Sequence, residues 1–257
     1  MNTPVQSQKT NAAIMNIRVA FNDILPGKAD EKIERLSQVL SLVAPVILRN
    51  EGKLTRVAEE GIVAIFKSAE SSLTGALDAF HDVSSRLSPD ELKLISIGIH
   101  AGTVFLAEVG YGDFSVPVAV SDGLRVAWRL SEAAARYDSR IMMTKTALNY
   151  VRSFDTRYNC RKLGVFYLSN RDTEEEVYDM FDADPTNLKY RKKRSRIIFE
   201  TGVDLFLKGE YLQSRNYFIE LLKYDRNDKT SKEYVFMCDK LLSGQPETPQ
   251  DRCLEVW

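Results

Sequence analysis

Histidines and cysteines, which often act as bases, nucleophiles or zinc ligands, are few and scattered in this sequence. His81 lies among helix-forming residues and His100 ends a strand-like run, so we expect both to be structural. Cys160 lies on a strand-like run and is expected to be a small buried apolar residue. No zinc-binding spacing and no pairing of a nucleophile with a base stands out.

A basic run opens a helix-like stretch late in the chain, from Lys189 to Arg196. Such a run attracts nucleic acid or anionic lipid in some proteins. Here it begins a helix, and acidic Asp182 and Asp184 precede it. A solvated helix face is therefore favoured over either partner, and we expect no nucleic-acid binding.

The overall composition is that of an ordinary soluble globular protein, with 44% hydrophobic residues and 35 Lys+Arg against 36 Asp+Glu. This balance of charge indicates no particular partner. Three widely separated cysteines argue against a disulfide framework and favour a reducing compartment, so we expect a cytoplasmic protein. No run approaches the roughly 18 apolar residues that span a bilayer, and the first residues lack the apolar core of a signal peptide. Neither export nor a membrane span is expected.

Hydrophobic periodicity predicts the elements that must position any site. Period-two runs predict strands at 14–21, 52–57, 61–66, 92–100, 103–109, 140–143, 163–168 and 176–181, and three-to-four spacing predicts helices at 30–48, 70–87 and 122–137. Pro45 is expected to distort the last turn of the first helix. The order β-α-β-β-α-β predicts an α+β fold, a ferredoxin-like, antiparallel-rich sheet with helices on one face.

After Asp184 and Pro185 only helical patterns follow. The residues at 199, 202, 203, 206, 209, 211, 214, 218 and 222 resemble one tetratricopeptide-like helical hairpin, and 231–242 would form a third helix. We therefore divide the chain into a disordered N-terminus at 1–13, a first domain at 14–185, a small all-α helical tail at 186–245 and a C-terminal tail at 246–257. Because one hairpin cannot bury its own apolar face, it is expected to pack on the first domain or on a protein partner.

Four ordered motifs in the first domain resemble those of class III adenylate and guanylate cyclases. The stretch 98–104, Gly-Ile-His-Ala-Gly-Thr-Val, which continues to Gly110, is similar to the family's "GIHTGPV…G", and 120–130 is similar to "IGDTVNLAARL", both without a gap. Upstream, 19–24 resembles "VLFADI" and 55–66 resembles "KTIGDGFMAVF". The likeness covers about residues 14–182, and the tail resembles the helical segment after the cyclase domain in many bacterial members. Any one motif alone would be weak.

The resemblance implies conversion of a nucleoside triphosphate to a 3′,5′-cyclic nucleotide and pyrophosphate, with a pair of Mg²⁺ or Mn²⁺ ions as cofactors. It implies that Asp23 and Glu60 are the metal ligands, and Glu60 replaces the family's second aspartate. Its extra methylene moves the carboxylate by about 1.5 Å, which is enough to slow catalysis strongly. Glu59 replaces a glycine in the same turn. The alternative is that Glu59 and Glu60 are solvated turn residues and Asp23 is a cap.

The resemblance also assigns residues to the nucleotide. Arg129 stands where the family stabilises charge on the α-phosphate, and Arg125 stands in place of the asparagine that orients the ribose. Arg129 could instead be an exposed helix residue paired with Glu132. Lys28 would hold phosphate after a loop that departs from the family pattern.

Base selection in the family uses a residue of the hairpin and one before the helix at 122–137. Those places hold Arg56 and either Ser121 or Asp122. A donor on Arg56 with an acceptor on Asp122 favours adenine over guanine, so ATP is the expected substrate, although the pair could be only a salt bridge.

In this family the sites lie at a head-to-tail dimer interface, so a homodimer through the first domain is implied. The substitutions favour a cyclase-like protein with impaired catalysis. The alternative is an inactive pseudo-cyclase that serves as a dimerisation, nucleotide-sensing or protein-interaction module, with a partner docked on the helical tail.

Overall fold

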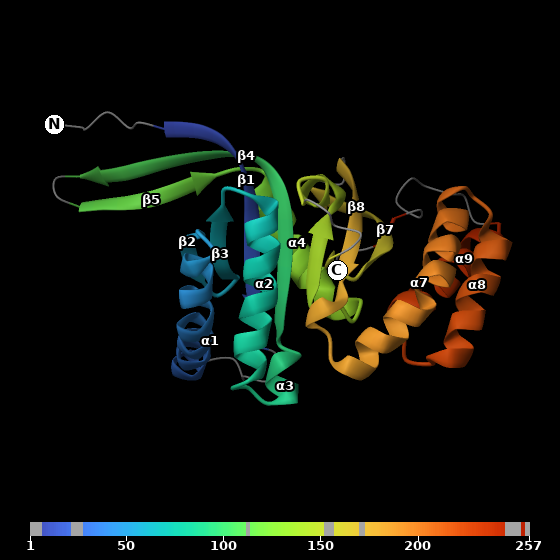
Figure 1. Cartoon of the computed structure of the whole chain (residues 1–257). Coiled ribbons are helices and arrows are strands. Elements are labelled where there is room, and N and C mark those ends of the chain that lie inside the picture. Colours follow the sequence, from blue (N-terminus) through green and yellow to red (C-terminus); the bar gives the residue numbers. More distant parts are fainter. Residues whose placement is uncertain are drawn as a thin grey trace.

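The computed structural model describes residues 7–21, 28–111, 114–151, 157–169, 173–244 and 253–254. Within them a mixed sheet has the strand order β2-β3-β1-β4-β6-β8-β7, and β5 pairs with the far part of β4 (Figure 1). The strands are β1 (Ser7–Val19), β2 (Lys53–Ala58), β3 (Gly61–Phe66), β4 (Ile95–Tyr111), β5 (Phe114–Val120), β6 (Ile141–Thr144), β7 (Cys160–Ser169) and β8 (Thr173–Met180). The helices are α1 (Ala29–Arg49), α2 (Ala69–Ser84), α3 (Pro89–Leu92), α4 (Gly123–Arg136), α5 (Lys145–Leu148), α7 (Thr186–Leu207), α8 (Tyr211–Tyr224) and α9 (Lys229–Leu242), with one 3₁₀ turn at Phe181–Ala183.

Helices cover both faces of the sheet. Because side chains alternate across a strand, Met15 and Ile17 of β1 pack in the core beneath α1 and α2, whereas Ile14 packs in a separate core beneath α4. The predicted α+β fold is confirmed, and its element order follows the prediction closely. The expectation that the helices lie on one face is wrong, since α4 crosses the opposite face from α1 and α2.

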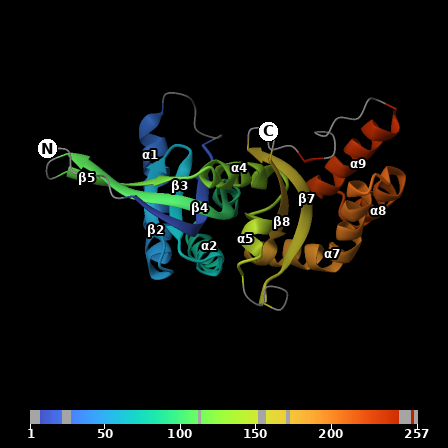
Figure 2. The ribbon, with the colours of Figure 1, turned by 90° about the horizontal axis from the view of Figure 1, so that it is seen from above.

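Two long central strands differ from the prediction. The runs expected at 92–100 and 103–109 form the single strand β4, because Ala101 and Gly102 continue the ladder opposite Ala13 and Ala12 of β1. β1 itself begins at Ser7, so residues 7–13, expected to be disordered, belong to the sheet. The far part of β4 and β5, a strand that was not predicted, form an arm that projects from the body (Figures 1 and 2).

Gly98 sets the closeness of α4 to the sheet. A Cβ atom at this position would lie 2.0 Å from the Ala127 carbonyl oxygen and 2.6 Å from the Ser131 backbone nitrogen, so only glycine permits the contact. Ser96 Oγ, on the same strand, donates to the Ser131 carbonyl at 2.6 Å. The middle of α4 is therefore fixed against β4.

The helical tail packs on the first domain. Phe199, Phe206, Phe218 and Tyr234 of α7, α8 and α9 are buried in one core together with residues of α4, β6, β7 and β8. Burying each aromatic side chain contributes about 1.5–3 kcal/mol. The apolar face of the tail was expected to pack on the first domain or on a protein partner, and the structure shows the first of these.

Small residues lie where α7 and α8 touch, as the hairpin pattern predicts. Ser214 Oγ donates to the Gly202 carbonyl at 2.8 Å, and the Phe218 ring lies directly over Gly202. α7 also holds the basic run, of which Lys192 is buried while Lys193, Arg194 and Arg196 are exposed. The prediction that this run forms a solvated helix face is therefore wrong for Lys192.

Within the described ranges, no helix is both long enough and apolar enough to cross a membrane.

The helix α1 contains Pro45 and continues past it to Arg49.

Candidate functional site

A pocket of about 740 Å³ lies between the β2–β3 hairpin, β5 and the first turns of α4. Its floor is Asn16 of β1. The lining residues are Asn16, Thr55, Arg56, Glu60, Gly61, Val63, Val116, Pro117, Val118, Ala119, Ser121, Leu124, Arg125, Trp128 and Arg129. Five of these are residues to which the sequence assigned a metal or nucleotide role: Arg56, Glu60, Ser121, Arg125 and Arg129.

A bulge in β2 places Arg56 at the pocket. Leu54 pairs with Ala64 and Arg56 pairs with Val63, so Thr55 is an extra residue between them. A bulge of this kind reverses the alternation of the strand locally and re-aims the side chains that follow. Arg56 thereby shares the face of Val63, which is the α4 side of the sheet.

The hairpin turn separates its two glutamates. Glu60 Oε2 accepts from Arg56 Nη2 at 3.1 Å, whereas Glu59 pairs with Lys32 of α1 at 2.7 Å. Gly61 ends the turn at φ +128°, and a Cβ there would lie 2.5 Å from the Ile17 carbonyl oxygen. The turn therefore directs Glu60 to the pocket and Glu59 away from it.

α4 brings two arginines to the same pocket. Arg125 and Arg129 are four residues apart and thus lie on one face of the helix. Ser121 Oγ accepts from the Gly123 backbone N–H at 3.1 Å and donates to the Thr103 carbonyl at 2.7 Å, so this hydroxyl fixes the start of the helix. Trp128 lies between the arginines in sequence and adds an aromatic wall.

Asn16 is a candidate that the motifs did not reveal. It is only 3% exposed, and its Oδ1 accepts from Ser131 Oγ at 2.8 Å. The signal was present as one amide within the apolar run 12–17, because buried polar side chains need a partner. Its position on the pocket floor explains why the strand tolerates it.

Three predicted site residues lie elsewhere. Asp122 is exposed at the N-cap position of α4 and is not part of the pocket lining. The expected pair of Arg56 with Asp122 is replaced by Arg56 with Glu60. Lys28 pairs with Glu31 at 2.7 Å, one turn along α1. Asp23 lies outside the described residues.

The electrostatics of the pocket suit an anion. Its described lining holds three arginines, Arg56, Arg125 and Arg129, against the one carboxylate of Glu60. Guanidinium groups present several donors in a planar fork that matches phosphate oxygens. In the described part of the chain no cluster of three or more His, Cys, Asp or Glu side chains could hold a metal ion. Glu60 is the one predicted metal ligand among the described residues, and its carboxylate is paired with Arg56.

His100 supports the start of α4 and does not take part in the pocket. Its Nδ1 lies 3.1 Å from Thr144 Oγ1, and its ring packs against Gly123. Burial lowers the pKa of His100 to about 4, because the charged imidazolium would lose its hydration. The ring is therefore neutral at physiological pH, in agreement with the structural role predicted for it.

Comparison with known proteins points to one kind of enzyme domain. The sequence is 21% identical over 245 residues to "Adenylate cyclase, terminal-differentiation specific" of Dictyostelium discoideum. This match takes in 89% of the present chain, so it extends into the helical tail, but only 12% of that much longer relative. No family model matches the sequence.

Solved structures of cyclases share the fold. A bacterial light-regulated adenylyl cyclase superposes with a TM-score of 0.59 at 16% identity, over 74% of this chain and 58% of that one. The guanylate cyclase domain of RhGC from Catenaria anguillulae, in complex with GTP, superposes with a TM-score of 0.54 at 11% identity, over 67% and 97% of the two chains. The described chain therefore has the α+β fold of class III nucleotide cyclase domains, with a helical part at its C-terminal end.

Proposed function

We propose that this chain binds a nucleoside triphosphate in the pocket between the β2–β3 hairpin, β5 and α4, and that it cyclises the nucleotide weakly or not at all. The observation that carries this proposal is the charge of the described lining: three arginines stand against one carboxylate, and that carboxylate is paired with Arg56. A polyphosphate is the metabolite class that such a lining recognises.

Each side chain has a role in this proposal. Arg125 and Arg129 project from one face of α4 and donate hydrogen bonds to phosphate oxygens. Trp128 and Leu124 provide the apolar surface on which a base or ribose lies. Ser121 acts indirectly, because its hydroxyl holds the first turn of α4 in place.

Catalysis requires more than the described pocket offers. Asp23 and Glu60 remain the predicted metal ligands, but Arg56 already pairs with one oxygen of Glu60 and competes with a cation for its charge. The longer side chain of Glu60 adds a geometric error, and misplacements of about 1 Å cost on the order of a hundredfold in rate. Impaired cyclisation is therefore the proposal, with Mg²⁺ or Mn²⁺ as the ions to supply in an assay.

ATP is the first triphosphate to test. The adenine argument from the sequence needed Asp122 beside Arg56, and the observed partner of Arg56 is Glu60. The preference for ATP now rests on the relative named an adenylate cyclase and on the light-regulated adenylyl cyclase structure. GTP belongs in every assay beside it.

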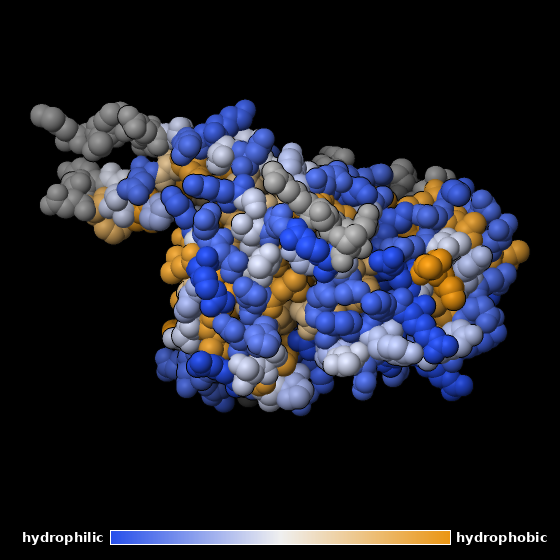
Figure 3. All heavy atoms as spheres, in the orientation of Figure 1, coloured by the Kyte–Doolittle hydropathy of each residue, from blue (hydrophilic) through white to orange (hydrophobic). Residues whose placement is uncertain are grey.

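A homodimer through the first domain is part of the same proposal. The β4–β5 arm exposes the apolar side chains of Phe105, Val109, Phe114, Val116 and Val120, and Figure 3 shows hydrophobic atoms on this arm. Phe114 is 69% exposed, which is unfavourable for a ring that has no covering surface. Light scattering should show a dimer for the wild type and a monomer for Phe114→Glu; a wild-type monomer at high concentration rejects this part.

The alternative, a pseudo-cyclase whose helical tail docks a protein partner, keeps the same fold and pocket. The tetratricopeptide likeness of that tail stays a prediction.

Two measurements distinguish nucleotide binding with impaired cyclisation from an intact enzyme and from a protein that binds no nucleotide. Purified protein is incubated with ATP or GTP and Mg²⁺ or Mn²⁺, and cyclic product is sought by mass spectrometry, while the melting temperature is followed with each triphosphate. We expect a raised melting temperature with little or no product. Product formed at a rate typical of an active cyclase, and lost in Asp23→Ala, would replace the proposal by an intact enzyme; no thermal shift and no product would reject nucleotide binding.

A further inference from the structure

The carboxyl end of α4 is held by the helical tail. The contacts are Lys192 Nζ to the Asp138 carbonyl at 2.7 Å, Thr230 Oγ1 to the Tyr137 carbonyl at 3.2 Å, Lys229 to the Asp138 carboxylate at 2.9 Å and Glu233 to Arg136 at 3.1 Å. Thr230 and Lys192 thus donate to the carbonyls of Tyr137 and Asp138, the two residues that follow α4 and lie beyond its own donors. Two of the groups are lysines, which also oppose the negative end of the helix dipole.

The backbone at this end has a conformation that is uncommon for a residue other than glycine. Asp138 has φ +50°, a left-handed conformation that glycine or asparagine usually adopts after the end of a helix. The Ser139 backbone N–H closes the terminus on the Ala134 carbonyl at 2.9 Å. The carboxylate of Asp138 pairs with Lys229 while its carbonyl accepts from Lys192, so both tail lysines support this residue.

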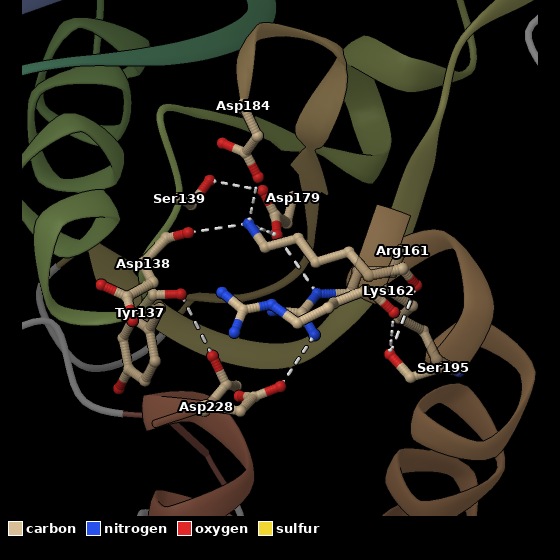
Figure 4. Close-up of polar contacts among 12 residues, drawn as sticks. Tyr137, Asp138, Ser139, Arg161, Lys162, Asp179, Asp184, Ser195 and Asp228 are labelled. Atoms are coloured by element: carbon tan, nitrogen blue, oxygen red, sulfur yellow. Dashed lines mark hydrogen bonds and ion pairs between the residues drawn. The ribbon is translucent and has the colours of Figure 1, made fainter. Parts of the chain in front are cut away.

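Lys192 is itself anchored in the sheet. Its ammonium lies 2.8 Å from Asp179 Oδ2 of β8 and 2.6 Å from Asp184 Oδ2, and the three side chains are 4% exposed or less. Arg161 Nε of β7 also pairs with Asp179, at 3.1 Å. Figure 4 shows Asp138 and Ser139 beside this cluster. The tail, the sheet and the end of α4 therefore form one connected unit.

We propose that the helical tail is a positioning element for α4 and, through it, for Arg125 and Arg129, with Glu233 and Lys229 as positioning residues; this inference rests on the nucleotide-binding function proposed above. α4 has 14 residues and contacts Gly98 at its middle, through Ala127 and Ser131. A displaced carboxyl end therefore turns the helix about this contact. Arg125, in the amino-terminal half, then moves relative to the β2–β3 hairpin, and Arg129, beside the contact itself, turns with the helix.

A charge reversal at a partly exposed ion pair tests the proposal without removing a buried side chain. Glu233→Arg sets two like charges together, and Arg136→Glu in the same chain restores an ion pair; the wild-type side chains are 27% and 33% exposed, so both variants are expected to fold. Hydrogen exchange of the α4 amides and titration with ATP and GTP are measured for each. We expect Glu233→Arg to speed exchange in α4 and weaken triphosphate binding about two- to tenfold, and the double variant to recover both.

A matched control removes a different contact between tail and first domain. The ion pair of Asp204 runs from α7 to Lys162 of β7 and not to α4, so Asp204→Arg should leave α4 exchange and triphosphate affinity unchanged. Unchanged exchange in Glu233→Arg, or faster exchange with unchanged affinity, overturns the positioning role. Equal losses in Asp204→Arg overturn it as well. If the wild type binds neither triphosphate, the proposed function fails separately, and α4 exchange alone decides whether the tail holds the helix.

Discussion

Replacing Lys192 by methionine removes an ammonium group from a fully buried cluster of charges. The Lys192 ammonium lies within hydrogen-bonding distance of Asp179, Asp184 and the Asp138 carbonyl, at 2.8, 2.6 and 2.7 Å. Both carboxylates are 0% exposed, so water cannot replace the lost partner. The substitution therefore leaves buried negative charge and an unsatisfied carbonyl.

The expected loss follows from the state of each carboxylate. Removing one partner of a buried ion pair costs about 3–5 kcal/mol. Asp179 keeps Arg161 as a partner, and burial raises the pKa of Asp184 to about 6, so Asp184 takes up a proton more readily than an ordinary aspartate. Because of both effects, we expect the free energy of unfolding to fall by about 3 kcal/mol at pH 7.5, the lower end of that range. The loss should be smaller at pH 5.5, where Asp184 is protonated in a larger fraction of molecules.

Urea unfolding of the whole chain, followed by circular dichroism at the two pH values, measures this loss. Lys193→Met is the matched control, because the neighbouring lysine is exposed on the same helix. We expect the control to change the free energy of unfolding by less than about 0.5 kcal/mol. A Lys192→Met variant that loses no more than the control, or that loses more at pH 5.5 than at pH 7.5, would refute the reasoning.

Three further outcomes are expected. Gly61→Ala should cost about 1–3 kcal/mol in urea unfolding, because φ is +128° and the new Cβ meets the Ile17 carbonyl; Gly209→Ala, at φ +81° with nothing within 4 Å, should cost less. The pKa of His100 falls from 6.5 to about 4, so the contribution of its neutral ring to stability is complete above pH 6.5 and is lost as the pH falls toward 4. His100→Gln should remove this dependence, which is measured as the slope of the free energy of unfolding against pH. The pKa of Asp184 rises from 3.8 to about 6, so its contribution to the free energy of unfolding is greatest below pH 3.8 and falls as the pH rises through 6. The stability of the wild type relative to Asp184→Asn should fall between these two pH values.

The motifs located the pocket because they fixed residues on elements whose type was readable. Arg125 and Arg129 lie on a strongly periodic helix, and Arg56 and Glu60 lie on a hairpin with a short turn. The four residues line one pocket, and their roles in it stay predictions.

The details of pairing could not be read in the same way. The bulge at Thr55 depends on the partner strand β3 and has no signature in β2 alone. The ladder through Ala101 and Gly102 depends on β1, because small side chains give no alternating pattern of their own. Asp122 was expected beside Arg56, but Glu60 lies across the turn of the same hairpin and takes its place.

The buried charges escaped sequence reasoning for a related reason. Lys192 belongs to a run of basic residues that is mostly exposed, and Asp179 and Asp184 lie around the end of the first domain. Burial of such charges is unfavourable unless all are paired, so no pattern of residues predicted it. Only the docking of α7 against β7 and β8 brings them together.

Isothermal titration of ATP and GTP in the presence of EDTA tests the central claim most directly, since it separates recognition by arginines from recognition by metal ions. The wild type should bind at least one triphosphate, and Arg125→Ala and Arg129→Ala should each weaken binding about ten- to a hundredfold. Arg86→Ala, an exposed arginine outside the pocket, should bind as the wild type does. No binding of either triphosphate by the wild type, or binding that survives the loss of both Arg125 and Arg129, would contradict the account.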